Sequence, residues 1–223
     1  EEHATNLFHV AAALEQLEKE SGVHLVLALE PEPWCLLESV QETLVWLGDE
    51  AMAVAAEAGN EAAARRHLGL CLDLCHASVV GEDPVELVEL CERSGIRIGK
   101  VQLSQALVAR GPGGLEQLLA YDEPVWLHQT FLEGGEHGPF LDLSDPALRE
   151  LELGEDDVLR SHFHVPLSWK GEEPLGSSWP ELYAFLDLVR AGGLPEGVPL
   201  EVETYTNPSI AEELEFAAGY LLR

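Results

Sequence analysis

Acidic, imidazole and amide side chains recur at one kind of place in this sequence, near the end of each short apolar run. Residues 69–75 show this best, because they read Gly-Leu-Cys-Leu-Asp-Leu-Cys and are followed at once by a histidine. A carboxylate at the end of a buried strand is costly unless a metal ion or a hydrogen-bond network compensates for its lost hydration. The candidate site residues are Glu30, Glu32, Asp73, His76, Gln102, His128, His162, His164, Glu201 and Glu203.

Together these residue types indicate a divalent metal site. Carboxylates combined with one or two imidazoles suit Mn²⁺, Mg²⁺, Co²⁺ or Zn²⁺. No compact motif such as H-E-x-x-H occurs, so the ligands would come from distant strands. Each residue also has a structural explanation: Glu30 could cap the next helix, His164 could be a hydrogen-bonded core histidine, and Glu201 could point outward. Their shared placement favours the metal site.

Short apolar runs alternate with helical patterns, which predicts parallel strands with helices outside them. The runs are almost continuously apolar, as expected when both faces of a sheet are covered. In a (β/α) barrel the carboxyl ends of the strands form the active-site face, and the candidate residues fall there. Strands are expected over residues 24–30, 67–75, 96–103, 124–131, 161–167 and 200–206, and helices over 34–58, 84–93, 179–191 and 208–222.

Residues 111–157 depart from this pattern. They are rich in Gly, Asp and Glu, and their weak periodicity predicts a loop-rich insertion on the active-site face. Otherwise residues 1–223 are expected to form a single domain, because a chain of 223 residues with 46% apolar composition can bury one large core. No G-x-G-x-x-G or P-loop motif follows a strand, which argues against dinucleotide- and NTP-binding folds.

The charge balance is strongly acidic, with 41 Asp and Glu against 12 Lys and Arg and a net charge of −29. Such a surface repels phosphate backbones, so no nucleic-acid partner is expected. Adaptation to high salt explains the acidity better than a specialised partner does. No apolar run is long enough to span a membrane and no signal peptide is visible, which predicts a cytoplasmic protein without a membrane partner.

The four cysteines, Cys35, Cys71, Cys75 and Cys91, form no C-x-x-C pair. Cys71 and Cys75 share the strand parity of the aspartate between them, so both are expected to point into the core. The pattern favours small buried apolar side chains in a reducing cytosol over a disulfide or a zinc site.

Several of these segments together resemble the xylose isomerase-like TIM barrels, a superfamily of sugar isomerases and epimerases that also includes the endonuclease IV group. Residues 69–76 resemble the D-x-x-H motif of the fifth strand, and Leu-Glu-Pro-Glu-Pro at 29–33 and Glu-Thr at 203–204 resemble the fourth- and eighth-strand glutamates. Within the superfamily, the chain is most similar to the EboE subgroup, described as a metabolite traffic protein. The segments that carry this likeness are 29–33, 100–104, 126–129, 162–166 and 200–206.

The resemblance implies an α/β fold that is the C-terminal part, about strands 4 to 8, of a (β/α)8 TIM barrel. In the isomerases of the superfamily, two metal-bound carboxylates transfer a proton through an enediolate, and Glu30 and Glu203 would be that catalytic pair. The implied metal ligands are Glu30, Asp73 and Glu203, supplemented by His128, His162 or His164, and the implied substrate-binding residues are His76, Glu32, Gln102 and Glu201.

Two departures from the family pattern stand out. Gln102 occupies the sixth-strand position where the family has a metal-binding histidine, and an amide oxygen is a weaker, neutral ligand. Either another histidine replaces that imidazole, or the metal site is weakened or lost. Strands one to three have no counterpart before Glu30, and the chain does not begin with Met, which predicts that the N-terminal part of the barrel lies upstream.

The leading hypothesis is therefore a divalent-metal-dependent sugar or sugar-phosphate isomerase or epimerase, with a polyol, sugar or related metabolite as its small-molecule partner. The alternative is a non-catalytic metabolite-binding or trafficking protein on the same barrel, with a possible partner protein in a metabolite pathway. Gln102 and the subgroup favour this alternative. A metal phosphodiesterase like endonuclease IV is a third hypothesis, and the acidic charge argues against it.

Overall fold

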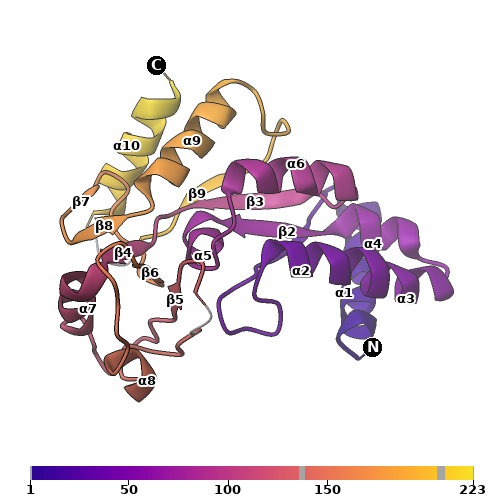
Figure 1. Ribbon diagram of the computed structural model, residues 1–223. Helices are drawn as coiled ribbons and strands as arrows, with labels where there is room; N and C mark the ends of the chain where they lie inside the picture. Colours follow the sequence, from indigo (N-terminus) through magenta and orange to yellow (C-terminus); the bar gives the residue numbers. More distant parts are fainter. Residues whose placement is uncertain (1, 136–138, 205–208, 223) are drawn as a thin grey trace.

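A computed structural model describes residues 2–135, 139–204 and 209–222 of the chain. It contains two sheets (Figure 1): four parallel strands in the order β1-β2-β3-β9, and five antiparallel strands in the order β5-β6-β4-β8-β7. The strands are β1 (Leu27–Leu29), β2 (Leu68–Asp73), β3 (Ile98–Leu103), β4 (Leu107–Arg110), β5 (Thr130–Leu132), β6 (Val158–Ser161), β7 (Gly171–Glu172), β8 (Leu175–Ser177) and β9 (Leu200–Val202). The helices are α1 (Glu2–Ser21), α2 (Val40–Val45), the π-helical η1 (Trp46–Ala51), α3 (Met52–Glu57), α4 (Glu61–His67), α5 (Leu74–Val79), α6 (Pro84–Ser94), α7 (Gly111–Leu119), α8 (Pro146–Arg149), α9 (Trp179–Arg190) and α10 (Ile210–Leu221).

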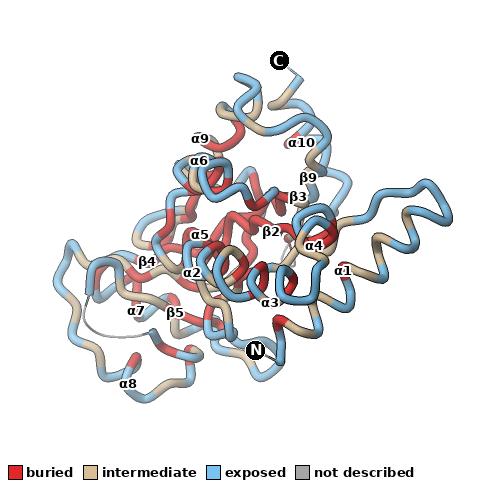
Figure 2. The backbone as a smooth tube through the Cα atoms, turned by 90° about the vertical axis from the view of Figure 1, so that its right-hand side faces the viewer, coloured by how far each residue is buried: buried red, intermediate tan, exposed pale blue. Residues whose placement is uncertain are grey.

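One face of the parallel sheet is apolar and covered by helices. Leu70 and Leu72 of β2, and Val101 and Leu103 of β3, are buried in one hydrophobic core with helix residues such as Phe185 of α9. Buried residues accordingly concentrate in β2, β3 and α5 (Figure 2). This core fixes the sheet, and with it the position of every group at the carboxyl ends of its strands.

The opposite face of the same sheet is polar. Because successive strand residues point to opposite sides, Cys71 and Asp73 share this face. Asp73 lies beside Gln102 in the register of β2 with β3, and Gln102 lies beside Glu201 in the register of β3 with β9. The sequence therefore separates an apolar, helix-covered side from a side that carries ionisable groups.

The described residues form an open sheet rather than a closed barrel. Within this part of the chain β9 pairs directly with β3, so no strand lies between them. Only residues 104–106 separate β3 from β4, and a parallel neighbour needs a crossover of about a dozen residues or more. The chain therefore leaves the parallel sheet at this point, and β4 becomes the central strand of the antiparallel one.

Two predicted strands are wrong in extent. Of residues 124–131 and 161–167, only short parts are in strands, β5 and β6, and these two pair antiparallel with each other. Of the strand predicted over 200–206, residues 200–202 form β9, and residues 205 and 206 lie outside the described part of the chain.

The helix predicted over residues 34–58 begins later and changes type along its length. Trp34 has a φ of 68°, which a right-handed helix does not allow. The helix begins at Val40, after Ser39 as its N-cap, and the buried carboxylate of Glu82 accepts the backbone N–H of Val40. The π-helical η1 follows, and α3 completes the segment.

The helices predicted over 84–93 and 179–191 are confirmed as α6 and α9. Asp83 caps α6 by accepting hydrogen bonds from the backbone N–H groups of Val85 and Glu86. Pro84, in the first turn of the helix, has no backbone N–H that needs a partner. Gly95 ends the same helix with a φ of 71°, a conformation that suits glycine.

The segment 111–157 contains α7, β5 and α8 between its loops. Leu118, Phe140, Leu143 and Leu148 are buried, and they form a second hydrophobic core with the antiparallel sheet. This segment therefore packs against the antiparallel sheet, from which the loop after β6 extends.

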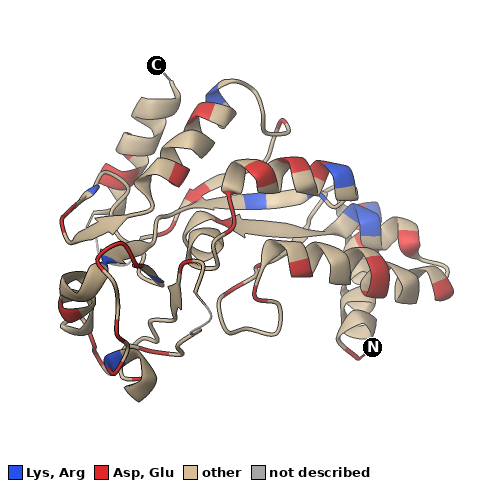
Figure 3. Ribbon diagram, in the orientation of Figure 1, with Lys and Arg blue, Asp and Glu red and all other residues tan. Residues whose placement is uncertain are grey.

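Acidic positions recur along α6, α9 and the loops of the antiparallel sheet, whereas Lys and Arg positions are few (Figure 3). None of the helices in the described residues is both long enough and apolar enough to cross a membrane.

Candidate metal centre

Asp73 ends β2 and caps α5, which places its carboxylate at the carboxyl end of the parallel sheet. Its Oδ1 accepts the backbone N–H of His76 at 2.8 Å and the hydroxyl of Ser104 at 2.9 Å. Its Oδ2 has no hydrogen-bond partner among the described residues, although Asp73 is only 2% exposed. A buried carboxylate oxygen without a partner is unfavourable, and a cation would compensate for it.

Two further carboxylates lie beside Asp73. Glu30 follows β1 and Glu203 follows β9, and ligand oxygens of the three residues all lie within 4.8 Å of one another. Burial raises the pKa of Glu30; His76 opposes this rise, and the carboxylates of Asp73 and Glu203 add to it. A divalent cation would relieve both the burial cost and the repulsion between these groups.

Three imidazoles converge next to the carboxylates. The Nε2 atom of His162 lies 3.0 Å from Nε2 of His76 and 3.1 Å from Nε2 of His164. His76 follows β2, whereas His162 and His164 lie just after β6, so the two sheets meet at this point.

The second nitrogen of each ring faces an oxygen acceptor. Nδ1 of His76 lies 3.0 Å from the carbonyl oxygen of Pro31. Nδ1 of His164 lies 2.9 Å from the carbonyl oxygen of Glu203, and Nδ1 of His162 lies 2.8 Å from Oε1 of Gln129. The amide nitrogen of Gln129 donates to the carbonyl of Pro33 at 3.2 Å, which orients its oxygen toward His162. Because these oxygens can only accept, Nδ1 carries the proton in each ring, and the three Nε2 lone pairs face one another. Metal-binding histidines are held in this way.

The electrostatics of the imidazoles agree with this assignment. Burial, followed by the neighbouring His76, His164 and His128, lowers the pKa of His162 to about 2. The ring is therefore neutral at physiological pH, as a metal ligand must be.

Glu32 and Cys75 extend the set of donors. Ligand atoms of Glu32, His76 and His162 lie within 4.8 Å of one another, and so do those of Cys75 with His162 and His164. Cys75 is fully buried, and this burial raises the pKa of its thiol well above the ordinary value. The metal-free protein therefore holds Cys75 as a neutral thiol.

Two of the predicted site residues lie outside the cluster. Gln102 accepts the thiol hydrogen of Cys71 at 2.7 Å, and Glu201 accepts a hydrogen bond from Lys100 at 2.9 Å. Both lie on the polar face of the sheet at the level of Asp73 in the register of the strands, and Glu201 comes two residues before Glu203 in the chain.

His128 lines the same cavity without joining the three imidazoles. Its ring stacks on Phe163 with centroids 3.9 Å apart, and its Nδ1 lies 3.5 Å from a carboxylate oxygen of Asp142. Burial lowers its pKa, while Asp142 opposes that effect. His128 thus shapes the cavity wall.

Three residues of the site were not found by sequence reasoning. The sequence predicts that Cys75 is a small core residue, and it assigns no site contact to Ser104 or Gln129. Ser104 follows Gln102 with the same strand parity, and Gln129 directly follows His128 in an extended run. The strand parity of Ser104 and the position of Gln129 next to His128 are the sequence features that could indicate these two residues.

The cluster opens into a cavity of about 670 Å³. Its described lining includes four glutamates and no Lys or Arg. Val125, Trp126 and Leu127 are exposed large apolar residues of this lining. The cavity is lined by Glu30, Glu32, His76, Glu123, Val125, Trp126, Leu127, His128, Gln129, His162, Phe163, His164 and Glu203.

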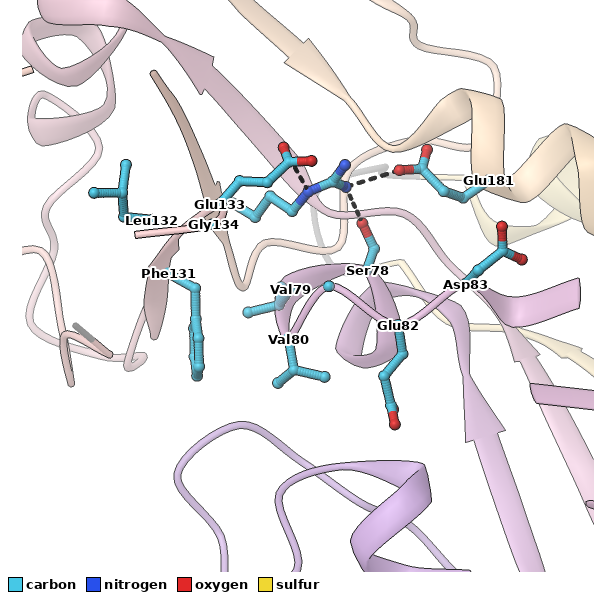
Figure 4. Close-up of a pocket in the computed structure, with 12 residues that line it drawn as sticks. Ser78, Val79, Val80, Glu82, Asp83, Phe131, Leu132, Glu133, Gly134 and Glu181 are labelled. Atoms are coloured by element: carbon cyan, nitrogen blue, oxygen red, sulfur yellow. Dashed lines mark hydrogen bonds and ion pairs between the residues drawn. The ribbon is translucent and has the colours of Figure 1, made fainter. Parts of the chain in front are cut away.

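A smaller cavity, of about 340 Å³, lies where α5 and β5 meet Glu181 of α9 (Figure 4). Arg160 lies in it with Nη1 2.8 Å from Glu181, Nε 3.5 Å from Glu133, and a hydrogen bond of 2.7 Å to the hydroxyl of Ser78. The guanidinium is already paired with two carboxylates, so this cavity holds a structural ion-pair network that connects α5 with α9.

A scan against protein-family models finds no match to the chain, and neither a search of curated proteins nor a search of solved structures finds a similar one. A function for this chain therefore rests on the geometry of its residues.

Proposed function

We propose that this chain binds a divalent transition metal and isomerises or epimerises a neutral sugar or polyol-like metabolite. The observation that carries the proposal is the junction of two donor groups: the carboxylates of Glu30, Asp73 and Glu203, and the imidazoles whose Nε2 lone pairs converge. A mixed oxygen and nitrogen donor set favours Mn²⁺, Co²⁺ or Zn²⁺ over Mg²⁺.

The residues present fit such an ion. Asp73 offers a buried oxygen that has no hydrogen-bond partner in the described part of the chain, and each imidazole is held through its Nδ1. Glu30, Asp73 and Glu203 supply the oxygen donors that would hold the ion, and His76, His162 and His164 supply the nitrogen donors. When bound, the ion polarises an oxygen of the substrate and lowers the barrier to removing a proton from the adjacent carbon.

The proton itself is moved by the chain's carboxylates. Glu30 has a raised pKa, which brings it closer to the range of an efficient general base and acid near neutral pH. In the proposed reaction Glu30 takes the proton from the carbon beside the carbonyl, and Glu203, protonated at that stage, donates a proton at the neighbouring atom or on the opposite face. The substrate passes through an enediolate, and the proton gained by Glu30 matches the one lost by Glu203, so the total charge of the two carboxyl groups is unchanged.

The cavity lining argues for a neutral substrate rather than a sugar phosphate. No Lys or Arg occurs in its described lining, whereas glutamates recur, so a phosphate group would meet repulsion without a paired cation. The volume, about 670 Å³, falls within the usual range of about 300–1,000 Å³ for small-molecule sites. Trp126 and its apolar neighbours favour a substrate that carries an apolar group beside its hydroxyl groups.

We further propose that the parallel sheet is a segment of a (β/α)8 barrel of the xylose isomerase-like type. Three features support this proposal: helices cover one face of the sheet, ionisable groups lie on the other, and the donors lie at the carboxyl ends of the strands. The antiparallel sheet would then supply His162 and His164 to the barrel's active-site end.

The second candidate function is binding of the same class of metabolite without turnover. One observation favours it: Gln102 occupies the position where the resemblance implies a metal-binding histidine, and its oxygen is occupied by the thiol of Cys71. The imidazoles of the antiparallel sheet would then hold the ion for ligand binding alone.

Hydrogen exchange at carbon separates these two functions. Metal-loaded protein is incubated with a panel of neutral ketoses, aldoses and cyclic polyol ketones in D₂O, and deuterium incorporation beside the carbonyl is followed by NMR. Glu203→Gln is expected to slow exchange by at least about 100-fold, the lower end of what a positioned acid or base contributes. Glu201→Gln, two residues away on the same face, is expected to stay near the wild-type rate because Glu201 pairs with Lys100. Binding of these compounds without exchange would support the second candidate and reject the first.

A further inference from the structure

A second group of metal-binding side chains lies at the other end of the parallel sheet. Glu18 belongs to α1, His24 lies three residues before β1, and His67 is the last residue of α4, directly before β2. One ligand atom of each lies within 4.8 Å of the others. Asp73 ends β2 at its opposite end and His76 follows it there, so this group is separate from the candidate metal centre.

His67 has the environment of a metal ligand rather than that of a hydrogen-bonded core histidine. The residue is 0% exposed, and its Nδ1 lies 2.8 Å from the carbonyl of Leu25, which fixes the proton on Nδ1. Its Nε2 has no hydrogen-bond partner within the described chain and lies 3.5 Å from a carboxylate oxygen of Glu18. Buried imidazole nitrogens normally have a partner, so this lone pair indicates a missing one.

The other two members supply the exposed side of the group. The rings of His24 and His67 have centroids 5.3 Å apart, and Nε2 of His24 lies 3.1 Å from the carbonyl of Arg66. The guanidinium of Arg66 binds both oxygens of Glu18, one of them through Nε at 2.6 Å. A carboxylate has about four lone-pair sites, so Glu18 can bind a cation while Arg66 holds it in place.

We propose that Glu18, His24 and His67 form a second metal site, for Zn²⁺ or another borderline divalent ion such as Co²⁺ or Ni²⁺. Two imidazoles and one carboxylate are the donor set that such ions prefer, whereas Mg²⁺ and Ca²⁺ prefer oxygen ligands. The ion would connect α1 to α4 and to the segment that enters β1. Its role is structural, because this end of the sheet lies away from the cavity that holds the candidate metal centre.

Metal titration of two matched histidine variants tests the site. Both are made in an Asp73→Asn background, which weakens the candidate metal centre. His24→Ala removes an exposed ligand with little risk to folding, and His9→Ala removes an exposed histidine elsewhere on α1. Zn²⁺ binding is followed by calorimetry and thermal unfolding, and Co²⁺ binding by its visible absorption.

The background protein and His9→Ala are expected to bind Zn²⁺ and to unfold at a higher temperature when it is present. His24→Ala is expected to lose at least about tenfold in affinity, as loss of even an outer-shell partner can cause, together with the Co²⁺ absorption and the thermal shift. Equal binding and equal thermal shifts in His24→Ala and His9→Ala would overturn the proposal. So would a background protein that binds no ion.

Discussion

The Nε2 atoms of His76 and His162 lie 3.0 Å apart, and each ring carries its proton on the other nitrogen. Two lone pairs at this distance repel each other unless a cation lies between them. Two nitrogens that bind one tetrahedral zinc ion at about 2.0–2.1 Å are about 3.3 Å apart, so a small separation of the rings would accommodate an ion. The relationship makes His162, which belongs to the antiparallel sheet region, part of the same site as the parallel sheet.

The neutral state of His162 predicts a pH-dependent stability of the metal-free protein. Because its folded-state pKa is depressed to about 2, the unfolded chain takes up a proton below about pH 6.5 that the folded chain does not. The free energy of unfolding should therefore fall as the pH falls below that value, by about 1.4 kcal/mol per pH unit from this residue, and be unaffected by it above. Urea denaturation of wild type and His162→Gln across this range measures the difference. Identical slopes for the two proteins would contradict the assignment.

The ion pairs of Arg160 are expected to differ in strength. Glu181 lies 2.8 Å from the guanidinium and its side chain is 23% exposed, whereas Glu133 lies 3.5 Å away and is 51% exposed. Glu133→Gln should cost less than about 1 kcal/mol of unfolding free energy, as exposed pairs do. Glu181→Gln should cost more, because it leaves the guanidinium less well paired in a drier environment. Chemical denaturation of the two variants decides this order, and a larger loss for Glu133→Gln would refute it.

Gln102 is expected to affect stability rather than metal binding. Its oxygen accepts the thiol hydrogen of Cys71 at 2.7 Å, so this oxygen already has a partner. Gln102→Met should lower the free energy of unfolding by about 1 kcal/mol, the value of one buried hydrogen bond, and leave metal affinity nearly unchanged. A loss of metal affinity of tenfold or more would instead show that Gln102 is a ligand. A tenfold loss corresponds to about 1.4 kcal/mol of binding free energy.

The apolar rim of the cavity predicts a preference among ligands. Trp126 is 63% exposed and belongs to the lining of the cavity, whereas Trp34 is 48% exposed and does not line it. Trp126→Ala should weaken binding of an aryl-substituted polyol by about 3- to 10-fold, corresponding to about 0.5–1.5 kcal/mol for an aromatic contact. Trp34→Ala should leave it unchanged. Equal effects of the two substitutions, measured by calorimetry, would show that the rim takes no part in binding.

The placement of the site residues could be predicted from the sequence because strand ends are local signals. Asp73 follows a continuous apolar run and is succeeded by His76, and Glu30 and Glu203 follow runs of the same kind. Parallel strands bring such ends together at one edge of a sheet. Here ligand oxygens of Glu30, Asp73 and Glu203 lie within 4.8 Å of one another. Strand parity alone does not identify the site residues, because Glu201 shares the face of Glu203 but lies about 6.6 Å nearer the amino end of the strand.

The antiparallel sheet could not be predicted because its strands are too short to have a pattern of their own. β5 has three residues and β6 has four, so their assignment depends on pairing with each other and with β4. Two features of His162 depend on this pairing: its position relative to His76, and its contact with Gln129. The role of Cys75 likewise became visible only through the two histidines that face it.

Calorimetric titration of two aspartate variants tests whether a divalent ion binds at Asp73. Chelator-stripped protein in a His24→Ala background, which removes the second site, is titrated with Mn²⁺ and with Zn²⁺ near neutral pH. Asp73→Asn keeps the N-cap and the Ser104 hydrogen bond but loses the charge, and Asp83→Asn makes the same change at the cap of α6. Asp83→Asn is expected to bind as the unsubstituted background does, and Asp73→Asn to lose at least about 100-fold in affinity, the upper end of what outer-shell changes cause. Equal affinities of the two variants, or no binding by the background protein, would contradict the account.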